Sequence, residues 1–136
     1  MADKTLKLEV VTPERKVLSE DIASLVVPAI GGYLGILPNH APMISGLEPG
    51  VLKYKVAGDY KKMAISGGFL EVSDNKVSVL ANTAELPQEI DVERAQQAKE
   101  RAEQRLQNKS EVDVLRAENA LKRAIARLRA AGRDVH

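Results

Sequence analysis

The chain changes character between residues 81 and 95. The residues before this stretch alternate between apolar and polar types and hold most of the glycines and all the aromatic side chains. From Ile90 onward the chain is dominated by Ala, Arg, Glu, Gln and Leu, with no proline and one glycine, Gly132. Strand-forming residues therefore give way to helix-forming residues. The sequence predicts an α+β protein with a β-domain at 1–86 and a helical domain at 87–136.

The first domain reads as a series of short strands separated by turn signals. Pro13 marks one turn, and the segments 57–59 and 73–75 have the composition of tight hairpin turns. Regularly spaced short strands are typical of a β-sandwich or a flattened barrel. The expected strands are 6–11, 17–18, 22–27, 33–37, 43–44, 51–56, 60–65, 68–72 and 76–80.

The second domain reads as two helices in an antiparallel hairpin. Asp91 is placed to cap the first helix, and Gly132 is placed to end the second. The segment 108–110 interrupts the helical pattern, and Ser110 followed by Asp113 resembles a second N-cap. Apolar residues recur at helical spacing in two stripes. The stripes are Ala95, Ala98, Ala102 and Leu106, then Val114, Ala117, Leu121, Ile125 and Leu128.

The predicted seam between the helices consists mostly of alanine. Alanine favours helix but buries little apolar area, whereas a large apolar side chain contributes roughly 1.5–3 kcal/mol when fully buried. We therefore expect the helices to form but their packed arrangement to be only marginally preferred. Such a hairpin can exchange one packing partner for another.

Arginines recur at spacings of seven and four on both helices. One interpretation is a solvated face with acidic partners one turn away. The other is that some of them bind phosphates or a carboxylate-rich partner. Arg123 and Arg127 fall opposite the apolar stripe, so they point outward if that stripe faces the first helix. The two sets are Arg94, Arg101 and Arg105, and Arg116, Arg123 and Arg127.

Composition excludes several classes of function. The net charge is +1, and the basic excess lies in residues 91–136 with no aromatic residues among it, so nucleic acid is not an expected partner. Without cysteine there are no disulfides, thiolate nucleophiles or cysteine metal sites. No signal-peptide core or apolar run of 18 residues occurs, so we expect membranes to be reached only through partner proteins.

No catalytic motif is recognisable. The glycine clusters lack the spacing and the lysine of a phosphate-binding loop, and there is no nucleophile elbow. His40 lies in a turn, where a structural or docking role is favoured over a ligand or base. We expect a protein that is not itself an enzyme.

Four motifs make the sequence resemble the epsilon subunit family of F-type ATP synthases over essentially its whole length. In chain order they are Val11-Thr-Pro13, Gly35-Ile-Leu-Pro-Asn-His-Ala-Pro42, Ser66-Gly-Gly-Phe69, and Leu80-Ala81 followed by Ala84-Glu85. The resemblance implies an all-β N-terminal sandwich of about ten strands, followed by a two-helix hairpin.

The resemblance also implies partners and a location. The sandwich would bind the gamma subunit and rest on the c-ring, on the cytoplasmic side of the bacterial cell membrane. The hairpin would lie on the sandwich or extend toward the alpha and beta subunits, where it would restrain ATP hydrolysis. Proton and sodium coupling stay open. The expected docking residues for gamma or the c-ring are Leu37, Pro38, Asn39, His40, Ala41 and Pro42.

Some members of this family bind ATP as a regulatory ligand through an Ile/Leu-Asp-x-x-Arg-Ala motif. Magnesium is possible at such a site but is not needed by the motif. In this chain Glu93, at a variable position of the motif, adds a negative charge near the pocket, where it either weakens binding or faces solvent. The residues that match the family site are Glu85, Ile90, Asp91, Arg94, Ala95, Arg101, Arg123 and Arg127.

Two further functions stay open from the sequence. The chain could act mainly as a nucleotide sensor, with ATP occupancy of the hairpin as its principal role. A basic amphipathic hairpin could also bind anionic membranes. The scarcity of bulky apolar side chains in the seam argues against the membrane alternative.

Overall fold

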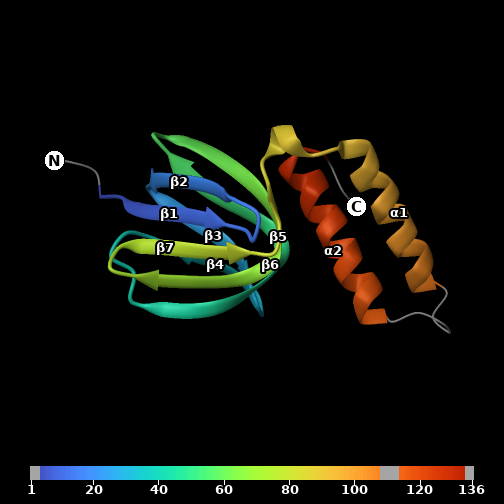
Figure 1. The fold of residues 1–136 in the computed structure, drawn as a ribbon, viewed down its shortest axis with the longest axis horizontal. Helices are drawn as coiled ribbons and strands as arrows, with labels where there is room; N and C mark the ends of the chain where they lie inside the picture. Colours follow the sequence, from blue (N-terminus) through green and yellow to red (C-terminus); the bar gives the residue numbers. More distant parts are fainter. Residues whose placement is uncertain (1–3, 108–113, 134–136) are drawn as a thin grey trace.

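A computed structural model describes residues 4–107 and 114–133. Figure 1 shows a strand-rich domain followed by two antiparallel helices. The strands are β1 (Leu6–Val11), β2 (Lys16–Ile22), β3 (Ser24–Ala29), β4 (Gly32–Ile36), β5 (Met43–Val56), β6 (Asp59–Ser73), β7 (Lys76–Ala81) and β8 (Ala84–Glu85). A short 3₁₀ helix η1 (Pro87–Glu89) leads to α1 (Val92–Gln107) and α2 (Val114–Ala130). The predicted α+β class is confirmed.

The strands run in the order β2-β1-β7-β6-β5-β3-β4, and β8 pairs with β6. All described pairs are antiparallel except β1 with β7. The β5–β6 ladder omits the pair Glu48 and Gly67, where the backbone of β6 is irregular, since Gly67 and Gly68 have positive φ angles. The sequence had suggested shorter pieces at 43–44 and 51–56, and at 60–65 and 68–72. Each pair of pieces is in fact one long strand, which accounts for eight described strands where about ten were expected.

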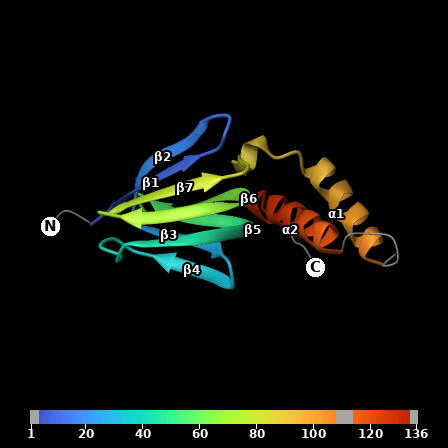
Figure 2. The ribbon, with the colours of Figure 1, turned by 60° about the horizontal axis from the view of Figure 1, so that its bottom comes forward.

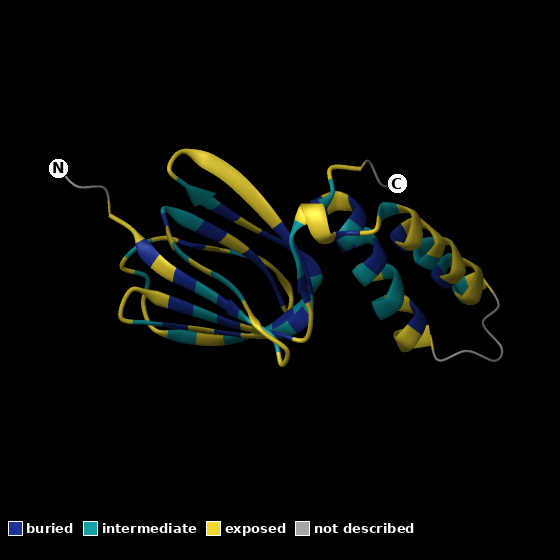
Figure 3. Ribbon diagram, turned by 45° about the horizontal axis from the view of Figure 1, so that its top comes forward, coloured by how far each residue is buried: buried dark blue, intermediate teal, exposed yellow. Residues whose placement is uncertain are grey.

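Buried and exposed residues alternate along the strands of the sandwich (Figure 3). In β1, Leu6, Leu8 and Val10 are buried and Lys7 is exposed, as the period of two requires. The core they join is aliphatic apart from Met63 and Tyr54. The predicted hairpin turns are confirmed, because Ala57 and Gly58, like Asp74 and Asn75, have the positive φ angles of tight two-residue turns. The sandwich therefore has a complete core of its own.

The helix ends follow the predicted signals. Asp91 Oδ1 accepts a hydrogen bond from the backbone N–H of Arg94 at 3.0 Å, which makes Asp91 the N-cap of α1. Gly132 has φ +82°, and the N–H of Arg133 donates to the carbonyl of Leu128 at 2.9 Å, closing α2 in a Schellman motif. The predicted break at 108–110 and the cap at Ser110 and Asp113 lie outside the described residues.

Helix α2 lies between the sandwich and α1 (Figure 2). It therefore needs apolar residues on two sides, whereas the sequence suggested one stripe. Ala117 and Leu128 of that stripe are buried, but Val114 is 39% exposed and the prediction is wrong there. The side toward the sheet is formed by Ala126 and Ala130, which the stripe did not include.

Candidate functional site

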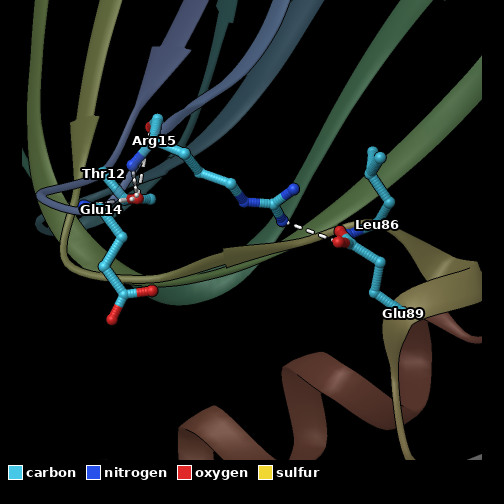
Figure 4. A network of polar contacts seen from close by, with 5 residues as sticks. All are labelled: Thr12, Glu14, Arg15, Leu86 and Glu89. Carbon is cyan, nitrogen blue, oxygen red and sulfur yellow. Dashed lines mark hydrogen bonds and ion pairs between the residues drawn. The ribbon is translucent and has the colours of Figure 1, made fainter.

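The two domains meet at the linker that leads from β8 through η1 to α1. Glu89 holds this linker in place (Figure 4), because its Oε1 accepts from the backbone N–H of Leu86 at 2.9 Å and its Oε2 accepts from Arg15 Nη2 at 2.7 Å. Arg15 belongs to the turn that Thr12 organises between β1 and β2. One carboxylate therefore connects the sandwich to the start of the helical domain.

The same contacts change the acidity of Glu89. Its pKa is lowered below the ordinary value of 4.5, chiefly by the hydrogen bond from Leu86. Desolvation raises the pKa in opposition, and the hydrogen bond and positive charge of Arg15 lower it further. Glu89 is therefore ionised at neutral pH, where it accepts both hydrogen bonds.

The residues of the predicted ATP motif surround the first turn of α1. Ile90 is 9% exposed and packs with Val51, Ala126 and Ala130 beneath α2. Ala95 is 3% exposed, so it faces the interior of the helical domain. Asp91 caps the helix as described above. Ile90 and Ala95 therefore serve packing, and the polar members Asp91 and Arg94 lie at the surface.

Glu85 and Arg127 are brought together across the domain boundary. Arg127 Nε donates to Glu85 Oε1 at 2.5 Å, and both side chains are a little over one quarter exposed. The sequence placed Arg127 opposite the apolar stripe, so that it points outward if that stripe faces the first helix. Arg127 does lie on the side of α2 opposite the stripe. That side faces the sandwich rather than solvent, so the expected outward direction is wrong.

The other predicted arginines are not joined to these groups. Arg94 and Arg101 are exposed and Arg123 is half-buried, and none of the three side chains makes an ion pair with a described residue. Glu93 is exposed, so it faces solvent rather than the interior of the hairpin. The start of α1 lies beside the end of α2 (Figure 1), which puts Arg94 at the same end of the hairpin as Arg127.

The predicted docking loop at 37–42 lies at the end of the sandwich away from the helices. Asn75 fixes it there, since its Oδ1 accepts from the N–H of Asn39 at 2.7 Å and its Nδ2 donates to the carbonyl of Thr5 at 3.1 Å. His40 Nδ1 lies 2.7 Å from the carbonyl oxygen of Ala41, to which it donates as the Nδ1–H tautomer. Leu37 is 62% exposed. The loop is thus a braced surface with an apolar side chain at its start.

Sequence reasoning missed an apolar row on the outer face of the sandwich. Phe69 on β6 lies opposite Gly46 on β5 and opposite Leu80 on β7, and the N–H of Ile30 donates to the carbonyl of Gly46. Ile44 lies two residues from Gly46 and therefore on the same face. All four side chains are more than half exposed. We call these four residues the apolar row: Ile30, Ile44, Phe69 and Leu80. In the sequence, the only sign of this row is that these apolar residues fall outside the alternating core pattern.

The fold and the linker between the two domains define a class of protein, a β-sandwich that carries a helical hairpin at one end. No described helix is long and apolar enough to cross a membrane. A family model described as ATP synthase, Delta/Epsilon chain, beta-sandwich domain matches residues 5–87. A second, described as ATP synthase, Delta/Epsilon chain, long alpha-helix domain, matches residues 88–132.

Individual proteins agree with these matches. The ATP synthase epsilon chain of Pelotomaculum thermopropionicum is 57% identical over 110 residues, which cover 81% of this chain and 82% of that one. A chain of the Euglena gracilis mitochondrial ATP synthase OSCP/F1/c-ring structure is 27% identical, with TM-score 0.78 and coverage of 96% and 82%. A chain of the Tetrahymena thermophila mitochondrial ATP synthase central stalk and c-ring structure shares the fold. It is 19% identical, with TM-score 0.60 and 97% coverage of both chains.

The chain belongs to the ATP synthase delta/epsilon family. This confirms the resemblance seen in the sequence motifs. It also confirms the prediction of a non-catalytic subunit.

Proposed function

We propose that this chain is a rotor subunit in the central stalk of an ion-translocating ATP synthase in bacteria, bound peripherally on the cytoplasmic side of the cell membrane. The sandwich docks on the gamma subunit and the c-ring. The hairpin leaves the sandwich, reaches the alpha and beta subunits, and restrains ATP hydrolysis. ATP bound to the docked hairpin opposes this release.

The observation that carries the proposal is the unequal packing of the two domains. The described sandwich core has 18 buried residues, whereas the cluster that joins it to the hairpin has five, three of them alanines. A buried methylene-sized group contributes only about 0.8 kcal/mol. The ion pairs Arg15–Glu89 and Glu48–Lys122 add little, because exposed pairs contribute about 0–1 kcal/mol each. One partly buried pair, Glu85–Arg127, joins α2 to the sandwich. Undocking therefore costs little and leaves the sandwich intact.

The test is ATP hydrolysis by the reconstituted complex with the whole chain and with a chain ending at residue 87. We expect hydrolysis to rise when residues 88–136 are removed, while the truncated chain stays bound to the complex. Unchanged hydrolysis with the truncated chain bound would refute the inhibitory role.

The ATP site is supported by charges that have no partner within the described residues. The guanidinium groups of Arg94, Arg101 and Arg123 are available for phosphates, which bind arginine through paired, charge-assisted hydrogen bonds. Asp91 uses Oδ1 for the helix cap, and Oδ2 is available to a donor such as an adenine amino group. Glu85 and Arg127 form an ion pair with each other.

Calorimetric titration with ATP, with and without magnesium, tests this site. We expect Arg94→Ala to weaken binding by about tenfold or more, a change of about 1.4 kcal/mol. Arg105→Ala is the matched control, since Arg105 is exposed on the same helix but lies outside the predicted site. Equal affinities for the two variants would exclude Arg94 from the site.

A further inference from the structure

A hollow separate from the predicted ATP site lies where the end of α2 meets the outer face of the sandwich. It is a hollow of about 540 Å³, within the range of small-molecule sites. Strands β3 to β6 form one wall, and the last turn of α2 with the residues after it forms the other. The residues that line this basic hollow are Val26, Tyr33, Val51, Lys53, Lys62, Arg129, Gly132 and Arg133. None of the predicted ATP-site residues is among them.

The charge of the basic hollow is uncompensated. Four of its lining residues are cationic, and none of the described lining residues is acidic. Elsewhere in the described chain Lys76, Lys99 and Lys122 each contact a carboxylate. The four cations of the hollow make no ion pair with a described residue. Cations that converge on a concave surface attract anions strongly.

The fold gives no reason for the two lysines of the basic hollow to lie next to each other. Lys53 and Lys62 lie directly opposite each other on β5 and β6. Like charges at directly opposite positions destabilise a β-sheet. Arg129 and Arg133 have a structural explanation, because cations near the C-terminus of a helix favour its dipole. The paired lysines have none, and a bound anion would offset their repulsion.

The remaining walls of the basic hollow could contact the uncharged part of a small organic anion. Tyr33 is 56% exposed, and its hydroxyl is fixed because it accepts from the N–H of Val51 at 3.2 Å. Val26 is 37% exposed beside it. An aromatic and an aliphatic surface thus adjoin the cations.

We propose that the basic hollow binds a phosphate-bearing small molecule. Its phosphate chain contacts the two lysines and the two arginines, and any ring it carries packs on Tyr33 and Val26. Arginine favours phosphate because its planar donors match two oxygens at once. A hollow enclosed from two sides fits a compact anion better than an extended acidic segment of a protein.

A ligand in this position would bind both domains at once, because Lys53 and Lys62 belong to the sandwich and Arg129 and Arg133 to the helical domain. A molecule that binds only the docked arrangement stabilises it by a free energy that rises with the logarithm of the ligand concentration above the Kd. The hollow would therefore retain the end of α2 on the sandwich. This consequence rests on the proposed release of the hairpin, whereas binding itself does not.

The test is a titration of the full chain with magnesium-free inorganic pyrophosphate, followed by backbone amide NMR. We expect shifts at residues 53, 62, 132 and 133. The double variant Lys53→Gln/Lys62→Gln should bind at least about tenfold more weakly. In the absence of ligand, the Tm of the double variant should be no lower than that of the unchanged chain, because the repulsion between the two lysines is gone. Lys7→Gln is the control, since Lys7 is exposed on β1 outside the hollow.

A nucleoside diphosphate in a second titration separates a free polyphosphate from a nucleotide. Tighter binding of the nucleoside diphosphate, lost in Tyr33→Leu, identifies the nucleotide; equal binding identifies the phosphate chain alone. The proposal is overturned if pyrophosphate at millimolar concentration shifts only residues 91–94, shifts nothing while an acidic peptide does, or binds the double variant unchanged. The double variant keeps Asp91 and Arg94, so its loss of pyrophosphate binding leaves the ATP proposal standing.

Discussion

At the scale of single residues, the glycine pair in the motif Ser66-Gly-Gly-Phe69 has a physical cause. Gly68 has φ +144°, and a Cβ placed there would lie 2.0 Å from the carbonyl oxygen of Leu80 and 2.9 Å from Cα of Ala81. Both of those atoms belong to the backbone of β7, which pairs with β6 at this point. No rotation of a side chain can relieve the contact.

We therefore expect Gly68→Ala to destabilise the protein by about 3 kcal/mol or more. Urea unfolding measures this as a lower midpoint with an unchanged slope. Gly35→Ala in β4 is the control, because nothing lies within 4 Å of its Cβ position and its φ is ordinary. Its stability should stay within about 1 kcal/mol of the unchanged chain. Similar midpoints for both variants would contradict the steric explanation.

The ionised carboxylate of Glu89 should make stability depend on pH. Because the pKa of Glu89 is lowered in the folded chain, its contribution is complete above the ordinary value of 4.5 and is lost as pH falls through the folded value. We expect Glu89→Gln to lower stability near neutral pH by less than about 1 kcal/mol, since the pair with Arg15 is partly exposed. The difference should vanish in more acidic solution.

Thermal unfolding from neutral to acidic pH measures this difference. Glu14→Gln serves as the control, because the Glu14 carboxylate points away from Glu89 (Figure 4). A loss that is the same at every pH would mean that the charge of Glu89 is not what stabilises the linker.

At the scale of elements, the docking of the hairpin depends on few large side chains. Ile90 is one of two large apolar residues in the five-residue cluster, the other being Val51. We expect Ile90→Ala to cost about 2 kcal/mol, near the lower limit for such truncations, because the site is at the edge of the cluster. Hydrogen exchange should then accelerate in α2 and stay unchanged in β1 and β7.

Leu115→Ala on α2 provides the comparison, because Leu115 is 66% exposed and should change neither region. If Ile90→Ala accelerated exchange in the sandwich as much as in α2, the two domains would unfold together. The proposed release of the hairpin would then lose its physical basis.

Helix α2 shows what sequence patterns can and cannot predict. Period-two alternation located the strands, and the caps Asp91 and Gly132 located the helix ends, because these signals act within a few residues. The second packed side of α2 escaped notice because Ala126 and Ala130 lack the bulk that marks an apolar stripe. The partner of Arg127 escaped because Glu85 lies 42 positions away in the chain. Only the resemblance to a family, not periodicity, placed Glu85 and Arg127 in one site.

At the scale of the whole molecule, the surfaces proposed for different partners lie apart. The hairpin occupies one end of the sandwich, and the braced loop at 37–42 lies at the other (Figure 1). The apolar row covers part of the outer face. Contiguous exposed apolar side chains are typical of protein-binding surfaces. A stalk partner bound to the apolar row or to the loop would therefore leave the proposed movement of the hairpin unobstructed.

If the apolar row is the surface by which the sandwich binds the proposed gamma subunit, replacing its aromatic residue should weaken that contact. Phe69→Ser should weaken association with a gamma-containing stalk by about tenfold or more, because buried aromatic side chains dominate interface energies. Folding stability should change little, since Phe69 is 64% exposed in the isolated chain. Tyr60→Ser is matched to it, as Tyr60 is 72% exposed but lies outside the row. Equal binding of both variants, measured by sedimentation with the purified stalk, would place the gamma contact elsewhere on the sandwich.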